Sequence, residues 1–169
     1  MKLTGKIALL AVAGALAFAA CKKKDTNTTT TPTKTSRDYL VEGKWQVTSM
    51  PMEYSVSGFG GQSWNQYDSM EACEKDNFAQ FMSSGKVWND EGASKCSSSD
   101  PQIDSTGTWT LNTDYTKMTF SDMGSNAFDV QELTSSSLKL YNKTDSSYTA
   151  GGFPITVSSK TTIIFKNIK

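Results

Sequence analysis

From about residue 43 onward, apolar and polar residues alternate in short runs. The clearest runs are 44–47, 108–111, 117–121, 128–131, 138–140 and 163–165. A two-residue period with threonine, β-branched and aromatic enrichment is typical of strands with one buried face. The pattern predicts eight strands, near residues 43–50, 76–82, 85–90, 105–112, 116–122, 126–133, 137–142 and 160–168.

Turn signals rich in glycine, serine and asparagine separate most of these strands, as at 84–85, 89–92, 112–114, 123–126 and 134–136. Between residues 104 and 142 the strands recur every 8–12 residues or so, which is typical of successive antiparallel hairpins. We therefore predict an all-β domain, an eight-stranded antiparallel up-and-down barrel, because closure removes exposed sheet edges. A β-sandwich of the same strands is the alternative.

Three segments depart from the alternation. Residues 66–74 have apolar spacing closer to that of a helix, so a short helix is predicted there. Residues 54–67 combine glycine, serine and aromatic residues without a period, and residues 145–154 do the same. We predict that both of these segments are mobile loops.

The N-terminus has the layout of a secretory signal peptide over residues 1–20. Lys2 and Lys6 precede twelve uncharged residues, 7–18, a run too short to span a bilayer as a helix. The run 18–21, Phe-Ala-Ala-Cys, resembles a lipobox, which implies that Cys21 is lipidated with palmitate-type acyl chains and becomes the first residue of a membrane lipoprotein. The alternative is ordinary signal cleavage that leaves Cys21 as a free thiol.

The segment 21–38 is predicted to be a threonine-rich flexible tether, because residues 22–38 contain no apolar side chain to bury. The barrel domain then occupies residues 39–169. Three cysteines are an odd number for an exported protein, and lipidation of Cys21 leaves one pair. We expect Cys73 and Cys96 to form a disulfide in an oxidising compartment, with two reduced thiols as the alternative.

Charge and composition exclude several function classes. Residues 39–169 contain 10 basic and 15 acidic residues, a balance unsuited to nucleic-acid binding. The chain has no histidine, which excludes Ser-His-Asp and Cys-His catalysis and HExxH zinc sites. With both remaining cysteines paired, no cysteine cluster is left to bind zinc, so we expect no metal and no cofactor.

The opening of the domain, Gly43-Lys44-Trp45, places a Gly-x-Trp motif on the first predicted strand. Together with the Cys73/Cys96 pair, Gly107-Thr108-Trp109 and the run 132–138, it resembles the lipocalin-like domains of short lipoproteins from Bacteroidetes-type bacteria. The resemblance covers roughly residues 39–169 and implies a barrel with the tryptophan at one end. Lipocalins usually pair that tryptophan with an arginine near the last strand, where this chain offers only Lys166 or Lys169.

Four aromatic residues are candidates for ligand binding at the barrel mouth: Phe59, Trp64, Tyr67 and Trp88. Phe59, Trp64 and Tyr67 lie in the predicted loop 54–67, which would close over an apolar ligand or stack on a sugar ring. The alternative is that these side chains fold back onto the barrel surface. Trp45 and Trp109 lie in regular alternation and are predicted core residues.

Glycoside hydrolysis needs a pair of carboxylates at a set separation. Five residues are candidates, but their spacing in the sequence fixes no such separation: Glu71, Glu74, Asp76, Asp90 and Glu91. We therefore predict that the protein is not an enzyme. The leading hypothesis is an envelope lipoprotein that binds a small apolar or sugar-like ligand. The alternative is a structural lipoprotein with a filled barrel that binds another envelope protein. In Bacteroidetes-type bacteria, acidic residues soon after the lipidated cysteine are associated with display on the cell surface. Only Asp25 among residues 22–25 is acidic. We therefore expect the protein on the periplasmic face of the outer membrane.

Overall fold

The computed structural model describes residues 33–123 and 127–168, which belong to a compact unit extending from Thr33 to Lys169. The predicted signal peptide 1–20, Cys21 and the tether as far as residue 32 lie outside the described residues. The buried core residues of the described part of the chain fall between Leu40 and Phe165, so the compact unit holds this core within itself, as a unit able to fold alone must.

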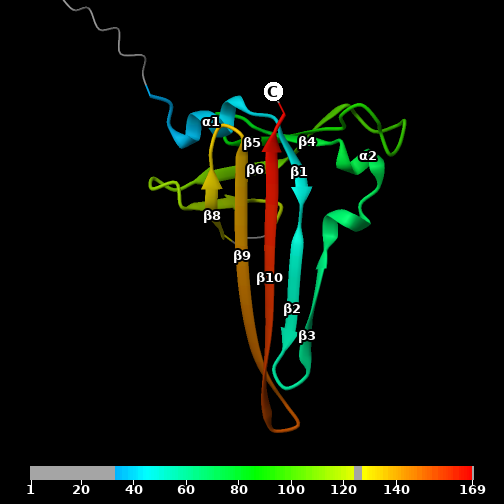
Figure 1. The fold of residues 1–169 in the computed structure, drawn as a ribbon, viewed down its shortest axis with the longest axis vertical. Coiled ribbons are helices and arrows are strands. Elements are labelled where there is room, and N and C mark those ends of the chain that lie inside the picture. The colour runs from blue at the N-terminus through cyan, green and yellow to red at the C-terminus, as the bar shows by residue number, and fades with distance from the viewer. Residues whose placement is uncertain (1–32, 124–126, 169) are drawn as a thin grey trace, which may run out of the picture. The chain divides into compact units, whose positions relative to one another are not determined.

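Ten strands form one sheet, and eight of them close into a barrel (Figure 1). Their bounds are β1 Trp45–Ser49, β2 Pro51–Val56, β3 Gly60–Asn65, β4 Phe78–Phe81, β5 Lys86–Asp90, β6 Ile103–Leu111, β7 Lys117–Phe120, β8 Ala127–Leu133, β9 Ser137–Ala150 and β10 Phe153–Asn167. The order around the barrel is β1-β4-β5-β6-β7-β8-β9-β10, and the antiparallel pairing of β1 with β10 closes it. The predicted eight-stranded antiparallel barrel is therefore confirmed, and closure excludes the sandwich.

The strands β2 and β3 are inserted into this up-and-down order as a hairpin between β1 and β4. Pairing along β10 explains their position: β1 pairs with its C-terminal part, and β2 pairs with residues 157–161. β9 pairs with β10 over the whole length of the hairpin from Phe153 to Lys166. The result is a four-stranded extension, β9-β10-β2-β3, that projects beyond the barrel wall (Figure 1).

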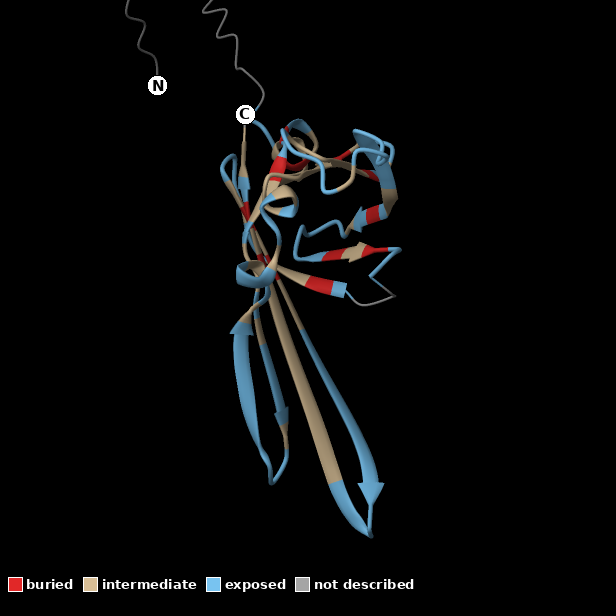
Figure 2. Cartoon of the chain, turned by 90° about the vertical axis from the view of Figure 1, so that its right-hand side faces the viewer, coloured by how far each residue is buried: buried red, intermediate tan, exposed pale blue. Residues whose placement is uncertain are grey.

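The extension corrects both loop predictions. Residues 54–67 are mostly β2 and β3, and residues 145–154 continue β9 and β10 around a two-residue turn. Gly151 and Gly152 both have positive φ, 60° and 85°, the backbone of the tight turn that suits a twisted hairpin. Both segments are mostly exposed (Figure 2), and their glycine and serine residues interrupt the apolar positions, so they lack the longer alternating runs of the barrel strands.

A helix closes one end of the barrel. α1, Ser36–Glu42, begins inside the predicted tether, so the boundary at residue 38 is wrong by the first turn of this helix. Thr35 caps it through a reciprocal capping box with Asp38. Leu40, on the barrel side of this helix, is fully buried. Asp38 has a lowered pKa, chiefly because its carboxylate accepts hydrogen bonds from the Thr35 backbone and hydroxyl.

The Gly-x-Trp motif lies directly under α1. Trp45 is fully buried, and its indole N–H donates to the Leu40 carbonyl at 2.9 Å. A Cβ at Gly43 would lie 2.6 Å from the indole nitrogen, so only glycine lets the ring fold back here. Lys166 is exposed and does not replace the arginine of lipocalins, and Lys169 lies outside the described residues. Arg37 instead lies 4.9 Å from the centre of the Trp109 ring and donates to the Ser83 carbonyl.

The barrel interior contains a chain of packed aromatic rings. Trp109, Phe81, Phe120 and Phe128 are joined by successive centroid distances of 5.9, 6.1 and 5.8 Å. These rings, together with Trp45, Leu40, Met118, Leu138, Leu140, Ile163 and Phe165, fill most of the interior with the chain's own side chains. Trp45 and Trp109 are thus core residues, as predicted.

The predicted disulfide is confirmed: Cys73 and Cys96 are bonded, with their Cα atoms 5.2 Å apart. In place of one helix over 66–74 the chain forms two short turns, η1 (Gln66–Ser69) and α2 (Ala72–Lys75). Asp76 Oδ2 holds the loop after β5, accepting hydrogen bonds from the backbone of Ala93 and Ser94 and from the Ser94 hydroxyl. The Ser94 hydroxyl is the largest cause of a lowered pKa at Asp76.

Replacing Leu40 by alanine tests whether α1 belongs to the core. Because the side chain is fully buried, L40A should lower the free energy of unfolding by about 2–5 kcal/mol in urea denaturation of residues 33–169. Ile103→Ala, at a position 48% exposed, is the control and should change it little. Equal effects of the two substitutions would show that α1 does not cap the core.

Replacing Asp76 by asparagine tests, through the pH dependence of stability, whether its carboxylate holds the loop at Ala93 and Ser94. Since the pKa of Asp76 is lowered from 3.8 in the folded state, its contribution to stability is present above that value and lost as pH falls through the lowered pKa. Urea midpoints measured between about pH 5 and pH 2 should fall more steeply for the unmodified chain than for D76N. Asp114→Asn, in an exposed turn, is the control, and parallel curves for D76N and the unmodified chain would contradict this role of Asp76.

Candidate functional site

Among the described residues, no helix closes the end of the barrel opposite α1. Strands β1 and β7 run toward this end, and β10 enters the barrel from it, so Met50, Met123 and Ile163 meet there from three separate segments. At the other end α1 and its buried Leu40 leave no opening. We call the end opposite α1 the mouth.

A cavity of about 150 Å³ lies inside the mouth. Its lining is apolar apart from Thr106 and Asp122, and comprises Val47, Met50, Ala79, Phe81, Val87, Phe120, Met123, Ile163 and Phe165. Phe81 and Phe120 form its floor, since they belong to the aromatic chain that fills the interior. The cavity is thus the unfilled outer part of the barrel core.

The apolar lining continues beyond the mouth onto the extension. Ile163 and Phe165 are buried inside the barrel, and side chains alternate along β10, so its odd-numbered residues share that face. The register then assigns a set of apolar side chains to this side of the extension, which we call the apolar face: Met52, Tyr54, Val56, Trp64, Tyr148, Phe153, Ile155 and Val157. The opposite face carries Glu53, Lys143, Asp145 and Lys160, joined in two ion pairs.

An irregularity in β1 makes this continuity possible. The pairing of β1 with β10 shifts between Val47 and Ser49, leaving Thr48 unpaired. Inward residues are odd-numbered before the shift and even-numbered after it, so Met50 and Met52 follow Val47 on the same side. Without this bulge the methionines would point to the outside of the sheet.

The structure separates the four aromatic residues predicted to bind ligand. Trp64 lies on the apolar face opposite Met52, is 44% exposed, and donates its indole N–H to the Gln66 side chain. Phe59 lies at the tip of the β2–β3 hairpin and is 81% exposed. They belong to the same hairpin but to different parts of it.

The other two predicted residues lie away from the mouth cavity. Tyr67 is in η1, and the Lys75 ammonium lies 5.2 Å from its ring centre. On β5, Val87 is buried inside the barrel, so the neighbouring Trp88 points outward from the wall. Trp88 therefore does not line the barrel interior.

Sequence reasoning missed the residues that do line the mouth. Met50 and Met123 border turns and fall outside the alternating runs, and Ile163 was assigned only to a strand. Their common cavity depends on the strand register and on the bulge, which a single sequence does not specify. Val47 and Phe165 are apolar positions of their alternating runs, and they are the one sequence signal that points to this cavity.

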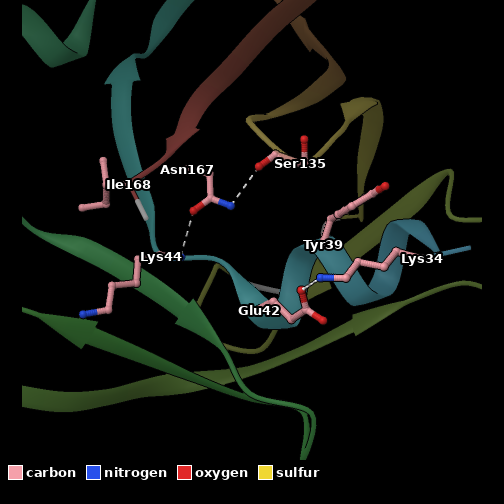
Figure 3. A pocket seen from close by; sticks show the side chains of 7 residues that line it. All are labelled: Lys34, Tyr39, Glu42, Lys44, Ser135, Asn167 and Ile168. Atoms are coloured by element: carbon pink, nitrogen blue, oxygen red, sulfur yellow. Dashed lines mark hydrogen bonds and ion pairs between the residues drawn. The ribbon is translucent and has the colours of Figure 1, made fainter. Parts of the chain in front are cut away.

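A second pocket, of about 390 Å³, lies at the closed end beside α1 (Figure 3). Most of its polar groups already have partners: Asn167 accepts from the Lys44 backbone and donates to the Ser135 carbonyl, and Lys34 pairs with Glu42. That hydrogen bond with Glu42 is the main cause of a raised pKa at Lys34. Because these groups satisfy one another, the pocket offers little for a ligand to replace.

Two of the carboxylates considered for catalysis hold loops in place through hydrogen bonds. Asp76 holds Ala93 and Ser94, and Asp90 accepts from the Gly92 backbone and from Gln102. Glu71 lies near both Cys73 and Cys96, but the two sulfurs are bonded to each other and are not free to bind a metal. Among the described residues, no helix has the length and apolar character needed to cross a bilayer.

The geometry defines an antiparallel barrel that has one end closed by a helix and one apolar mouth. A model of the lipocalin-like domain family matches residues 41–140, more than half of the chain. The chain therefore belongs to the lipocalin-like domain family, as the Gly-x-Trp motif indicates. No curated protein and no solved structure matches it.

Proposed function

We propose that this protein binds an apolar ligand end-on at the mouth of its barrel. The observation that carries the proposal is the 150 Å³ apolar cavity that continues onto the apolar face. Pockets that enclose a whole small-molecule ligand measure about 300–1,000 Å³, so this cavity has room for only one end of such a molecule. The remainder would lie along Met52, Tyr54 and Val157.

The lining favours an apolar ligand over a sugar. Only Thr106 and Asp122 offer polar groups in the cavity, whereas a sugar needs several hydrogen-bonding partners on burial. A sugar stacked on Phe59 and Trp64, as the sequence suggested, has less support because these rings lie at different levels of the hairpin.

We also propose that the protein is not an enzyme and that it is held in the envelope by a lipid on Cys21. The absence of histidine and the structural use of Asp76 and Asp90 support the first point. The lipobox-like run 18–21 and the disulfide support the second, since disulfides persist in oxidising compartments. The likeness to Bacteroidetes-type lipoproteins favours the outer membrane, on its periplasmic face.

A second function has one observation in its favour. The aromatic chain fills most of the interior, which suits a structural lipoprotein that contacts another envelope protein through its outer surface. The two functions differ in whether the mouth is occupied by a small molecule.

Replacing Met50 by glutamate tests ligand binding. A charge at the edge of an apolar cavity opposes entry of an apolar chain, so M50E should weaken binding of a fluorescent long-chain fatty acid by about tenfold or more. Ile103→Glu, on an exposed wall position, is the control and should bind as the unmodified chain does. Absence of binding by the unmodified chain, or equal binding by M50E, would leave the filled barrel as the better account.

Replacing Cys21 by serine tests the anchor. Cells expressing the full chain and fed an alkyne-tagged palmitate should label the unmodified protein, while C21S should remain unlabelled because it lacks the acylated thiol. Cys73→Ser/Cys96→Ser, which keeps Cys21, is the matched control and should still be labelled. Labelling of C21S would contradict lipidation at this residue.

A further inference from the structure

The free end of the extension consists of two hairpin tips, which point the same way in Figure 1 and spread apart in Figure 2. The β2–β3 tip is joined to β10 by two hydrogen bonds, from the Ser57 backbone to the Thr156 carbonyl at 2.8 Å and from the Thr156 backbone to the Ser57 hydroxyl at 2.9 Å. The β9–β10 tip turns at Gly151 and Gly152. Backbone pairing therefore holds both tips at the same end of the compact unit.

Each tip presents a phenylalanine to solvent. Phe59 is 81% exposed and Phe153 is 73% exposed, more than any other large hydrophobic residue in the described part of the chain. Tyr148, 53% exposed, lies on the same face one row behind Phe153, opposite Ile155. Exposed apolar side chains that share one end of a molecule mark an interaction site more often than single scattered ones.

Both hairpins lose all charge toward their tips. Residues 54–67 and 146–159 contain no aspartate, glutamate, lysine or arginine. The last charges before the tips are the pairs Lys160–Glu53 and Lys143–Asp145, at 2.6 and 2.7 Å. Seven residues separate Lys160 from Phe153 along β10, a charge-free length of about 23 Å.

This order, phenylalanine at the tip, tyrosine behind it and paired charges farther back, follows the polarity gradient of a lipid interface. The part of the extension outside the barrel, residues 51–65 and 142–161, carries two positive and two negative side chains in pairs, so it offers no excess charge to an anionic or a cationic partner. A zwitterionic lipid surface fits this neutrality. The free edges of β3 and β9 have unpaired backbone groups, which limits entry to the interfacial region.

We propose that the two hairpin tips insert Phe59 and Phe153 into the interface of a zwitterionic lipid bilayer. The insertion is a second contact with lipid, separate from the acyl anchor predicted at Cys21. It does not depend on ligand binding at the mouth, because Phe59 and Phe153 do not line the mouth cavity.

Cosedimentation of residues 33–169 with phosphatidylcholine vesicles tests the proposal without the anchor. The chain should bind, and Phe59→Ser/Phe153→Ser should bind about 10- to 100-fold more weakly. Ile103→Ser, which removes an exposed apolar side chain from the barrel wall, is the control that should bind as the unmodified chain does. Adding anionic phosphatidylglycerol should not strengthen binding, since the extension is neutral and the domain is acidic.

A direct readout comes from Phe153→Trp. Its fluorescence should shift to shorter wavelength with vesicles and be quenched by brominated acyl chains, whereas Ile103→Trp should show neither change. Failure of the unmodified chain to sediment, or undiminished binding by the double variant, would overturn the proposal. So would a concentration-dependent dimer, seen by analytical ultracentrifugation and abolished in the double variant, in the absence of vesicle binding, because the tips would then contact a second copy.

Discussion

The structure depends on the pairing of one strand, β10, with three others. Along one edge β10 pairs with β9, and along the other edge it pairs first with β2 and then with β1. The β1 pairing closes the barrel and buries Ile163 and Phe165, while the β2 pairing supports the extension. The same fifteen-residue strand therefore belongs to the core at one end and to the solvent-exposed sheet at the other.

The shared strand also links the two proposed activities. Because β10 keeps one side-chain parity throughout, the face that lines the barrel continues as the apolar face of the extension. The bulge at Thr48 brings Met50 and Met52 onto this same face, beside β10. An apolar ligand at the mouth and the hairpin tips thus lie on the same face of the sheet, on which Thr161 and Ser159 separate Ile163 from Val157 along β10.

The sequence predicted the parts whose residues are buried. Six of the eight barrel strands, all except β4 and β5, contain an alternating run that located them in the sequence. The extension escaped prediction because no core selects its apolar residues, so β2 and β3 resemble a glycine- and serine-rich loop. Gly151-Gly152 was an available hairpin signal, since two glycines suit a two-residue turn. α1 was missed because its seven residues include a single fully buried side chain, Leu40.

Within the described unit, α1 and the hairpin tips lie at opposite ends, since α1 closes the barrel end away from the extension (Figure 1). Fourteen residues join Cys21 to Thr35, and a fully extended chain of that length reaches about 50 Å. The fifteen residues of β10 span about the same distance. A lipid on Cys21, as proposed, and the two phenylalanines are therefore within reach of a single bilayer.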